Sequence, residues 1–370
     1  MDLTSVGIEK ETHLNDFVDK LKVFNKIMLW GLSESADAAI DFFNENNIVV
    51  NGIYDNDINK NGTYYRDIII LNPGDEVNDK NTALVITCSY YENIRKSLLV
   101  NDSNIDDRLF MFDGYFLEDN VYYNDDNVLN MINNNYNLLN DDKSKVLYKA
   151  LLKYRDIRDI NLIKDLYDSR SDCYLDEVFI SKFRNGLYID AGSYNADFIT
   201  TLSDRVDVSD SKFYIFEPNK YFSKSINDNL DGKYNFKVFQ MALCDIEGEM
   251  EFQQIESSTS HLVDKKYNAY KDKLDKTVEL VKINTLDNVV GDEVVTGIKV
   301  DIEGSEQAML LGSENIIKRD RPFMMISIYH KWDDLWKIQD YINSLNLNYK
   351  FYIRHYSLSV AKTILYCIPE

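Results

Sequence analysis

The sequence predicts an α/β protein with two Rossmann-like domains, a small one followed by a larger one of about seven strands, joined by a helical connector. Three observations support this prediction. The chain has 370 residues, more than a single hydrophobic core usually holds. Short apolar runs alternate with stretches of helical periodicity in two regions, the pattern of a parallel sheet with helical crossovers. Between these regions, residues 120–180 contain no strand-like run.

The first domain is expected over residues 1–115. Its strands are predicted at residues 26–30, 48–54 and 83–87. The turn after the first strand and Asp55 after the second stand where a Rossmann domain binds the phosphates and the ribose of a nucleotide. Ser33 and Ala36 replace the second and third glycines of a phosphate-binding loop, so nucleotide binding is not expected. We expect a structural, dimerising or substrate-presenting role.

A helical connector is expected over residues 116–180, which are dense in Asn, Asp and Leu. Apolar residues recur at helical spacing from Val146 to Tyr154. Asp141 and Asp142 precede this run and are predicted to cap its helix, because an aspartate side chain can accept hydrogen bonds from the free N–H groups of a first turn.

The second domain is expected over residues 181–370, where strands and helices alternate again. Its strands are predicted at residues 186–190, 212–217, 236–239, 297–301 and 323–328, with a closing hairpin at 349–353 and 363–366. Each run ends at a polar residue or a turn. An open parallel sheet binds its ligands at these carboxyl ends of the strands.

Composition restricts the partners and the compartment. The chain has 62 acidic and 41 basic side chains, a formal net charge of −21, which repels nucleic acid and anionic membrane surfaces. No apolar run approaches the roughly 18 residues of a membrane-spanning helix, and no export signal is recognised at the N-terminus. Four scattered cysteines without a Cys-x-x-Cys pair are expected to be reduced core residues. We therefore expect a cytoplasmic protein that binds neither nucleic acid nor membranes.

The most informative stretch follows the first strand of the second domain. That strand delivers Asp190 and Gly192 to a tight turn at a helix start, and Glu217 stands at the tip of the next strand, where a carboxylate can accept both hydroxyls of a ribose. A dinucleotide and S-adenosylmethionine both fit this arrangement. Only one of the three glycines of a dinucleotide loop is present, and Asp190 could bind the ammonium group of S-adenosylmethionine directly or through water. The sequence therefore favours S-adenosylmethionine.

These residues belong to a set of motifs by which the chain resembles the FkbM-type S-adenosylmethionine-dependent methyltransferases. The resemblance covers about residues 135–340, and its most specific element is IKVDIEGSE at residues 298–306. Supporting elements are LNDDKS at 139–144, DAGSY at 190–194, FEPN at 216–219 and ALCD at 242–245. The family usually has glycine where this chain has Ala196. The resemblance implies a class I, Rossmann-like, seven-stranded methyltransferase domain.

The resemblance also implies roles for individual residues. Asp190 and Gly192 would hold the methionine part of the cofactor, Glu217 would hold the ribose, and residues 240–245 would border the adenine. The predicted cofactor-binding residues are Asp190, Gly192, Ser193, Tyr194, Asn195, Glu217, Pro218, Ala242, Asp245 and Asp301.

Acidic residues crowd one strand tip and the helix start that follows it. Asp301, Glu303 and Glu306 lie there, with His330 near them in the predicted fold. Together they could bind Mg²⁺. Alternatively, Glu306 caps the helix or forms an ion pair, and Asp301 faces the sulfonium of the cofactor. The resemblance does not demand a metal, and we expect none.

Methyl transfer to a hydroxyl requires removal of a proton. His330 is the first candidate for the base, Glu303 ranks beside it and His261 below both, and Asp301 completes the predicted catalytic set. The expected acceptor is a hydroxyl of a sugar or glycan precursor, or an amine of a glycan-attached group, and a homodimer is compatible with the sequence. The rival interpretation is an inactive binding or scaffold protein with a methyltransferase fold, which Ala196 and the missing glycines of the first domain would favour.

Overall fold

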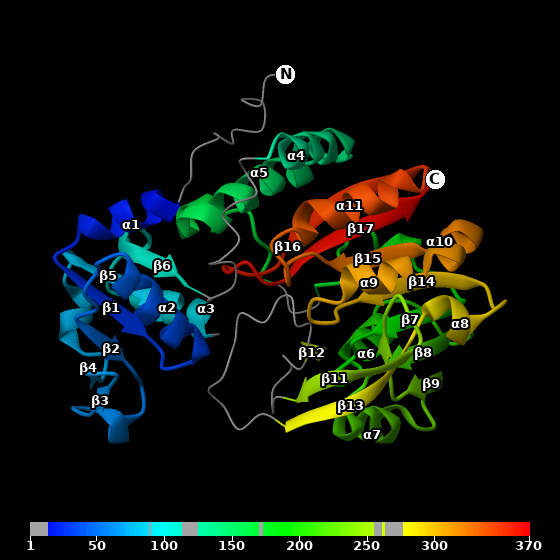
Figure 1. Cartoon of the computed structure of the whole chain (residues 1–370), viewed down its shortest axis with the longest axis horizontal. Coiled ribbons are helices and arrows are strands. Elements are labelled where there is room, and N and C mark those ends of the chain that lie inside the picture. Colours follow the sequence, from blue (N-terminus) through cyan, green and yellow to red (C-terminus); the bar gives the residue numbers. More distant parts are fainter. Residues whose placement is uncertain (1–13, 89, 113–124, 170–172, 255–260, 263–276) are drawn as a thin grey trace. The chain divides into compact units, whose positions relative to one another are not determined.

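The computed structural model describes residues 14–88, 90–112, 125–169, 173–254, 261–262 and 277–370. The chain forms two compact units (Figure 1). The first contains residues 1–136, 145–169 and 355–361, and the second contains residues 137–144, 170–354 and 362–370.

The first unit is built on a six-stranded sheet in the order β3-β4-β2-β1-β5-β6. Its strands are β1 (Lys26–Trp30), β2 (Gly52–Tyr54), β3 (Tyr64–Tyr65), β4 (Ile68–Leu71), β5 (Thr82–Ile86) and β6 (Leu109–Met111). Neighbouring strands pair in parallel, except β3 with β4. Its first three helices are α1 (Leu14–Lys22), α2 (Glu34–Glu45) and α3 (Tyr91–Leu99). The predicted small α/β module is confirmed.

One strand of this unit is shorter than predicted. Of residues 48–54, only Gly52–Tyr54 form β2. The side chain of Val49 is 74% exposed, so the apolar run before Asn51 does not continue into the sheet. The side-chain oxygen of Asn51 instead accepts the N–H of Ile27 at 2.8 Å. Because this acceptor is a side chain and not a backbone carbonyl, the regular backbone pairing between β1 and β2 ends there.

The predicted connector is helical but is not a separate domain. It contains α4 (Asp126–Leu138) and α5 (Asp142–Ile157). The carboxylate of Asp141 accepts the N–H of Ser144 at 2.8 Å, which confirms Asp141 as the cap of α5. The boundaries at 115 and 180 are corrected because α5 buries apolar side chains in the first unit, where the Tyr154 hydroxyl donates to the carbonyl of Leu358 at 2.8 Å.

The second unit contains the predicted seven-stranded sheet, in the order β16-β17-β15-β14-β7-β8-β9. Its strands are β7 (Leu187–Ala191), β8 (Lys212–Phe216), β9 (Asn235–Phe239), β14 (Val295–Val300), β15 (Phe323–Ser327), β16 (Tyr349–His355) and β17 (Thr363–Pro369). Five neighbouring strands, β15, β14, β7, β8 and β9, pair in parallel, and β17 is antiparallel to β15.

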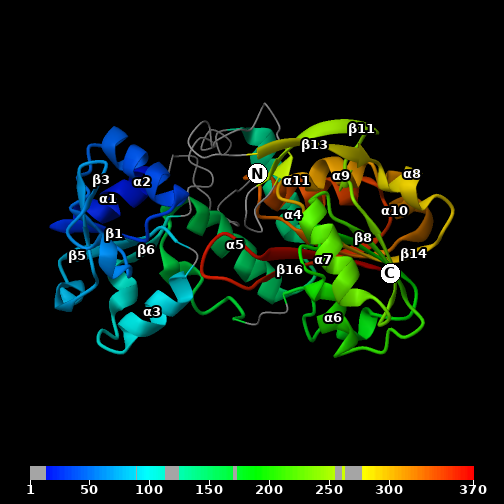
Figure 2. The ribbon, with the colours of Figure 1, turned by 90° about the horizontal axis from the view of Figure 1, so that it is seen from below.

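Helices cover both faces of this sheet. They are α6 (Asp197–Ser203), α7 (Lys220–Leu230), α8 (Leu286–Val290), α9 (Glu306–Leu311), α10 (Glu314–Asp320) and α11 (Asp334–Ser344). Figure 2 shows α9 and α11 on one face and α6 and α7 on the other. Among the described residues, no helix is long and apolar enough to cross a membrane.

The strand order of this sheet reverses between β7 and β14. The chain runs outward from β7 to β8 and β9 on one side, and from β14 to β15 on the other, so these two neighbours mark the point where the order reverses. In register, Asp190 lies opposite Lys299 and Ala191 opposite Val300. Open α/β sheets bind ligands outside the carboxyl ends of the strands at such a point.

A second, four-stranded sheet of this unit was not predicted. Its order is β10-β13-β11-β12, with β10 (Ala242–Leu243), β11 (Gly248–Gln254), β12 (His261–Leu262) and β13 (Thr277–Asn284). The two long strands, β11 and β13, intersperse apolar with charged residues and so contain no long apolar run. His261 begins β12, and residues 255–260 before it lie outside the described residues.

Candidate active site

The turn after β7 requires glycine at one position. Gly192 has a φ of 76°, in the left-handed region that glycine favours. A Cβ atom there would lie 1.8 Å from the carbonyl oxygen of Asp301, so the backbones that follow β7 and β14 approach too closely for any side chain. The N–H of Gly192 donates to the carbonyl of Phe216 at 3.0 Å and joins the turn to β8.

The rest of this turn has unusual backbone geometry. Tyr194 and Ala196 have φ angles of 51° and 67°, which is uncommon for residues with a side chain. Ala196 stands directly before α6, where the family usually has glycine. The turn therefore adopts the conformation that glycine would favour and accommodates the buried methyl group of Ala196.

Glu217 lies at the tip of β8, as predicted. One carboxylate oxygen accepts the N–H of Asn219 at 2.9 Å, and the other accepts the N–H of Tyr194 at 3.3 Å, so Glu217 ties this tip to the turn after β7. Burial raises the pKa of Glu217, although the two backbone hydrogen bonds oppose that rise. Pro218 follows it, and Asn219 caps α7 by accepting the N–H groups of Tyr221 and Phe222.

Asp190 has a partner that sequence reasoning missed. It is fully buried, and Lys299, near the carboxyl end of β14, lies 3.1 Å from its carboxylate. The hydroxyl of Ser193 donates to its other oxygen at 2.6 Å. Burial acts to lower the pKa of Lys299, but the negative charges of Asp190 and Asp301 raise it by more. The net change is upward, so the lysine is charged. A lysine flanked by Ile298 and Val300 in an apolar strand was the signal for a buried ion pair.

His330 and the three carboxylates predicted near it come together in the structure. The imidazole Nε2 lies 3.5 Å from Asp301 and 3.4 Å from Glu303, and Nδ1 lies 2.8 Å from Glu306. The side chain of His330 is 4% exposed, whereas those of Asp301 and Glu303 are 25% and 23% exposed. The two carboxylates are therefore the groups of this cluster that a substrate can reach.

Burial and charge set different pKa values within the cluster. Burial lowers the pKa of His330, but the carboxylates of Glu306, Glu303 and Asp301 outweigh it and raise the pKa to about 10. Burial raises the pKa of Glu303 to about 7, against the attraction of His330. Burial also acts to raise the pKa of Asp301, but His330 and Lys299 bring it below its usual range. At neutral pH His330 is cationic, Asp301 anionic, and Glu303 divided between its two forms.

Two tyrosines hold Asp301, and neither was predicted. The hydroxyl of Tyr174 donates to one carboxylate oxygen at 2.7 Å, and that of Tyr329 donates to the other at 3.1 Å. Tyr174 also lies 3.0 Å from the hydroxyl of Ser327. No spacing in the sequence pointed to Tyr174, because it approaches the sheet from a segment 127 residues before Asp301.

Three residues of the cluster are close enough together to bind a metal ion. Asp301, Glu306 and His330 offer ligand atoms that lie within 4.8 Å of one another. Glu306, however, accepts the N–H of Ile302 at 3.0 Å and pairs with His330, which is the ion-pairing alternative stated above. The imidazolium of His330 already supplies a positive charge to the three carboxylates. That the protein uses no metal stays a prediction.

The predicted adenine border lies in the smaller sheet. Ala242 is buried in β10, and Asp245 follows as an exposed residue that accepts a hydrogen bond from the Cys244 thiol at 3.2 Å. Asn195 and Tyr194, also predicted to bind the cofactor, are within the turn after β7. Their contacts with a cofactor remain predictions.

The strand tips of the first unit are occupied by the chain itself. A Cβ atom on Gly31 would lie 2.6 Å from the Cβ atom of Cys88, so Cys88 packs against the turn after β1. The hydroxyl of Thr87 donates to the carbonyl of Gly31 at 2.6 Å. Asp55 is paired with Lys60 at 2.8 Å. These contacts support the expectation that this unit binds no nucleotide.

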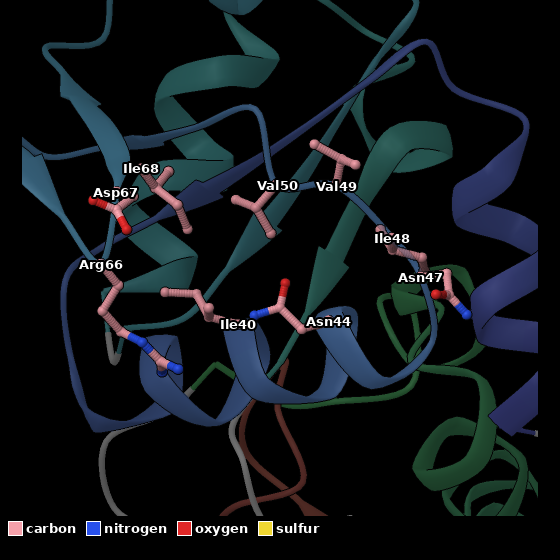
Figure 3. Close-up of a pocket in the computed structure, with 9 residues that line it drawn as sticks. All are labelled: Ile40, Asn44, Asn47, Ile48, Val49, Val50, Arg66, Asp67 and Ile68. Carbon is pink, nitrogen blue, oxygen red and sulfur yellow. The ribbon is translucent and has the colours of Figure 1, made fainter.

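A pocket of the first unit lies elsewhere. Figure 3 shows it between the second half of α2 and residues 47–50 and 66–68. Arg66 at this pocket is already paired with Asp37 and Asp41. The pocket therefore offers no free cation to a phosphate group.

Comparison with known families agrees with this geometry. Residues 190–351 match the model of the methyltransferase FkbM domain. The chain contains an FkbM methyltransferase domain. The FkbM domain begins at Asp190 and includes Glu217 and the whole His330 cluster. Residues 23–108 match a second model, described as C2185-like, N-terminal. No curated protein matches the chain.

Solved structures add evidence on the fold. The crystal structure of methyltransferase FkbM from Methylobacillus flagellatus KT aligns with a TM-score of 0.65 and 17% identity, over 99% of this chain and 96% of that one. The two proteins therefore share a fold, including the module before the FkbM domain. Fibrillarin from Aeropyrum pernix, solved with natively bound S-adenosyl-L-methionine, aligns at a TM-score of 0.31 and 11% identity over 53% of this chain and 76% of that one, which is too low to support an argument.

Proposed function

We propose that this protein transfers a methyl group from S-adenosylmethionine to a hydroxyl of a sugar or glycan precursor, with an amine of a glycan-attached group as the close variant. One observation supports the cofactor most strongly. Within the FkbM domain, Glu217 at the tip of β8 is hydrogen-bonded to the turn that contains Gly192 at the tip of β7. A carboxylate that can bind a ribose is thereby held beside a turn whose glycine allows a ligand to approach the backbone closely.

The chain's residues fit such a cofactor. Each carboxylate oxygen of Glu217 accepts one backbone N–H and keeps a further lone pair for a ribose hydroxyl. Asp301 is anionic and a quarter exposed, so it can face a cationic sulfonium. When bound, S-adenosylmethionine supplies an electrophilic methyl group on that sulfonium.

Glu303 is the base in this proposal. The acceptor oxygen attacks the methyl carbon, the carbon–sulfur bond breaks toward sulfur, and the proton of the acceptor passes to Glu303. A pKa of about 7 suits this task, because half of the Glu303 side chains are free to take a proton at neutral pH. His330, with a pKa of about 10, already holds its proton. His330 therefore positions Glu303, and the order of the two sequence candidates is reversed.

The acceptor class rests on the resemblance and on this base. A hydroxyl has a high pKa and needs its proton removed during transfer, whereas an amine reacts in its neutral form and needs no base in the site. A carboxylate at the exposed side of the cluster, tuned to neutral pH, supports a hydroxyl acceptor.

The test is transfer of an isotope-labelled methyl group from S-adenosylmethionine to matched sugars and amino sugars. We expect label in a hydroxyl-bearing sugar, as a base-stable methyl ether, and none with a Glu303→Gln variant under the same conditions. Binding of S-adenosylmethionine without transfer to any acceptor would favour the scaffold interpretation. Absence of binding would reject the cofactor as well.

A further inference from the structure

The buried pair of Asp190 and Lys299 has a consequence for how the cofactor is recognised. Two oxygen positions in the turn after β7 could accept the ammonium group of a methionine: the Asp190 carboxylate and the Gly192 carbonyl. Lys299 takes both, with its Nζ 3.1 Å from the carboxylate and 2.5 Å from the carbonyl oxygen.

The ammonium group of this lysine faces three oxygens, one in an ion pair with Asp190 and two backbone carbonyls that accept its hydrogen bonds. An ammonium group has three donors. The third points toward the carbonyl of Ala191 at 3.4 Å, and the side chain is 5% exposed. Lys299 is therefore enclosed by oxygens of its own chain and is closed to the carboxylate of a ligand.

Asp190 is equally closed to a ligand. Its side chain has no exposed surface, one oxygen faces Lys299, and the other accepts the Ser193 hydroxyl at 2.6 Å. Asp301, by contrast, is 25% exposed. A direct contact between Asp190 and a cofactor would require both of its present partners to move.

We propose that Lys299 and Asp190 are positioning residues, which hold the turn after β7 in its binding conformation, and that Asp190 does not touch the cofactor. This inference rests on the proposed function, because it concerns the site of the same cofactor. The pair fixes the carbonyls of Ala191 and Gly192 from behind, and Asp190 fixes Ser193, so three consecutive residues of the turn depend on it.

The test compares two neutral ligands. S-adenosylhomocysteine has the amino-acid end of the cofactor, methylthioadenosine lacks it, and neither has a sulfonium charge. Their dissociation constants are measured by calorimetry for the parent chain and for Asp190→Asn, Lys299→Met and the double variant. Glu217→Gln is the control, because the ribose is common to both ligands.

A positioning role predicts equal losses. Asp190→Asn should weaken both ligands by the same factor, about tenfold, because the shared turn is disturbed. Lys299→Met leaves a buried carboxylate without its cation and should weaken both ligands more. The double variant should bind both more tightly than Lys299→Met does, since no buried charge is left alone. If the two substitutions acted independently, the double variant would instead bind both ligands more weakly than Lys299→Met does.

Other outcomes overturn the inference. If Asp190→Asn weakens S-adenosylhomocysteine about tenfold or more and leaves methylthioadenosine unchanged, Asp190 contacts the amino-acid end directly. If the double variant binds both ligands no more tightly than Lys299→Met does, the proposed pairing of Asp190 with Lys299 is contradicted. If Lys299→Met does not fold, as thermal unfolding would reveal, the isosteric Asp190→Asn still decides between the two roles. A parent chain that binds neither ligand would reject the proposed function and this inference together, whereas selective loss in Asp190→Asn rejects the inference alone.

Discussion

Glu303 and His330 lie 3.4 Å apart, yet at neutral pH His330 is cationic, with a pKa of about 10, and Glu303, with a pKa of about 7, is divided between its two forms. The sequence could place both near the strand tips, because each follows an apolar strand. It could not rank them, since their pKa values depend on contacts with Glu306 and Asp301 that only the fold creates. The same holds for Lys299, Tyr174 and Tyr329, whose partners are distant in the chain.

Replacing the proposed base should reduce turnover without affecting the cofactor. Glu303→Gln keeps the shape of the side chain and removes its ability to take a proton. With a hydroxyl acceptor we expect turnover to fall by about 10²–10⁴-fold, with the dissociation constant of S-adenosylmethionine nearly unchanged. Steady-state kinetics and calorimetry measure the two quantities. Parental turnover at neutral pH would remove Glu303 from the mechanism, and a loss that high pH reverses would indicate an amine acceptor.

The pH dependence of turnover follows from the same pair. Glu303 acts when deprotonated and has a pKa of about 7, so turnover should rise as pH increases through about 7. The charge of His330 lowers the pKa of Glu303, and its removal in His330→Gln should shift the midpoint of the profile to higher pH. The measurement is kcat against pH for both proteins. An unchanged or lower midpoint in His330→Gln would contradict the claim that the charge of His330 lowers the pKa of Glu303.

At the scale of elements, the regular strands were the most predictable part of the fold. Residues 26–30 and the central strands β7, β14 and β15 of the larger sheet could be predicted because they are buried on both faces and read as nearly continuous apolar runs. The small sheet of β11 and β13 was missed, since strands with one exposed face carry charges such as Glu249 and Glu251. The break at Asn51 depends on a side-chain hydrogen bond, which has no signal in hydropathy.

The turn after β7 gives a prediction at this scale. Gly192 and Gly232 both have positive φ angles, 76° and 68°, but an added Cβ atom meets the carbonyl of Asp301 only at Gly192 and nothing within 4 Å at Gly232. Gly232→Ala should therefore lower the free energy of unfolding by about 1 kcal/mol, because the only cost is to hold a residue with a side chain at a positive φ angle. Gly192→Ala should cost about 3 kcal/mol or more and abolish cofactor binding. Denaturant unfolding measures both, and equal losses would contradict the close approach.

At the scale of the whole molecule, the sequence indicated two α/β parts but not their boundaries. The first unit takes in residues 145–169 and 355–361, which are far from it in the chain. Linear patterns of hydropathy cannot show that a late segment returns to an early domain. The resemblance to the FkbM family was nevertheless visible in short motifs, because these lie at strand tips where ligand contact restricts the residue type.

The first unit should bind no nucleotide. Its strand tips are filled by Cys88, by the bond between Thr87 and Gly31, and by the Asp55–Lys60 pair. The full chain, first saturated with S-adenosylhomocysteine to block the FkbM domain, is titrated by calorimetry with NAD, a sugar nucleotide and coenzyme A. We expect no heat of binding. Tight binding of any of these ligands that is lost in Asp55→Ala would make this unit a nucleotide carrier instead.

The most direct test of the central claim is the affinity of the full chain for S-adenosylmethionine, measured by calorimetry for the parent and for Glu217→Ala. Glu217 is buried beside the turn after β7, and loss of a charge-assisted ribose contact costs about 1.5–3 kcal/mol. We therefore expect the parent to bind one equivalent and the variant to bind about 10- to 150-fold more weakly. Equal affinity in the two proteins, or no binding by the parent, would contradict the placement of the cofactor at the tips of β7 and β8.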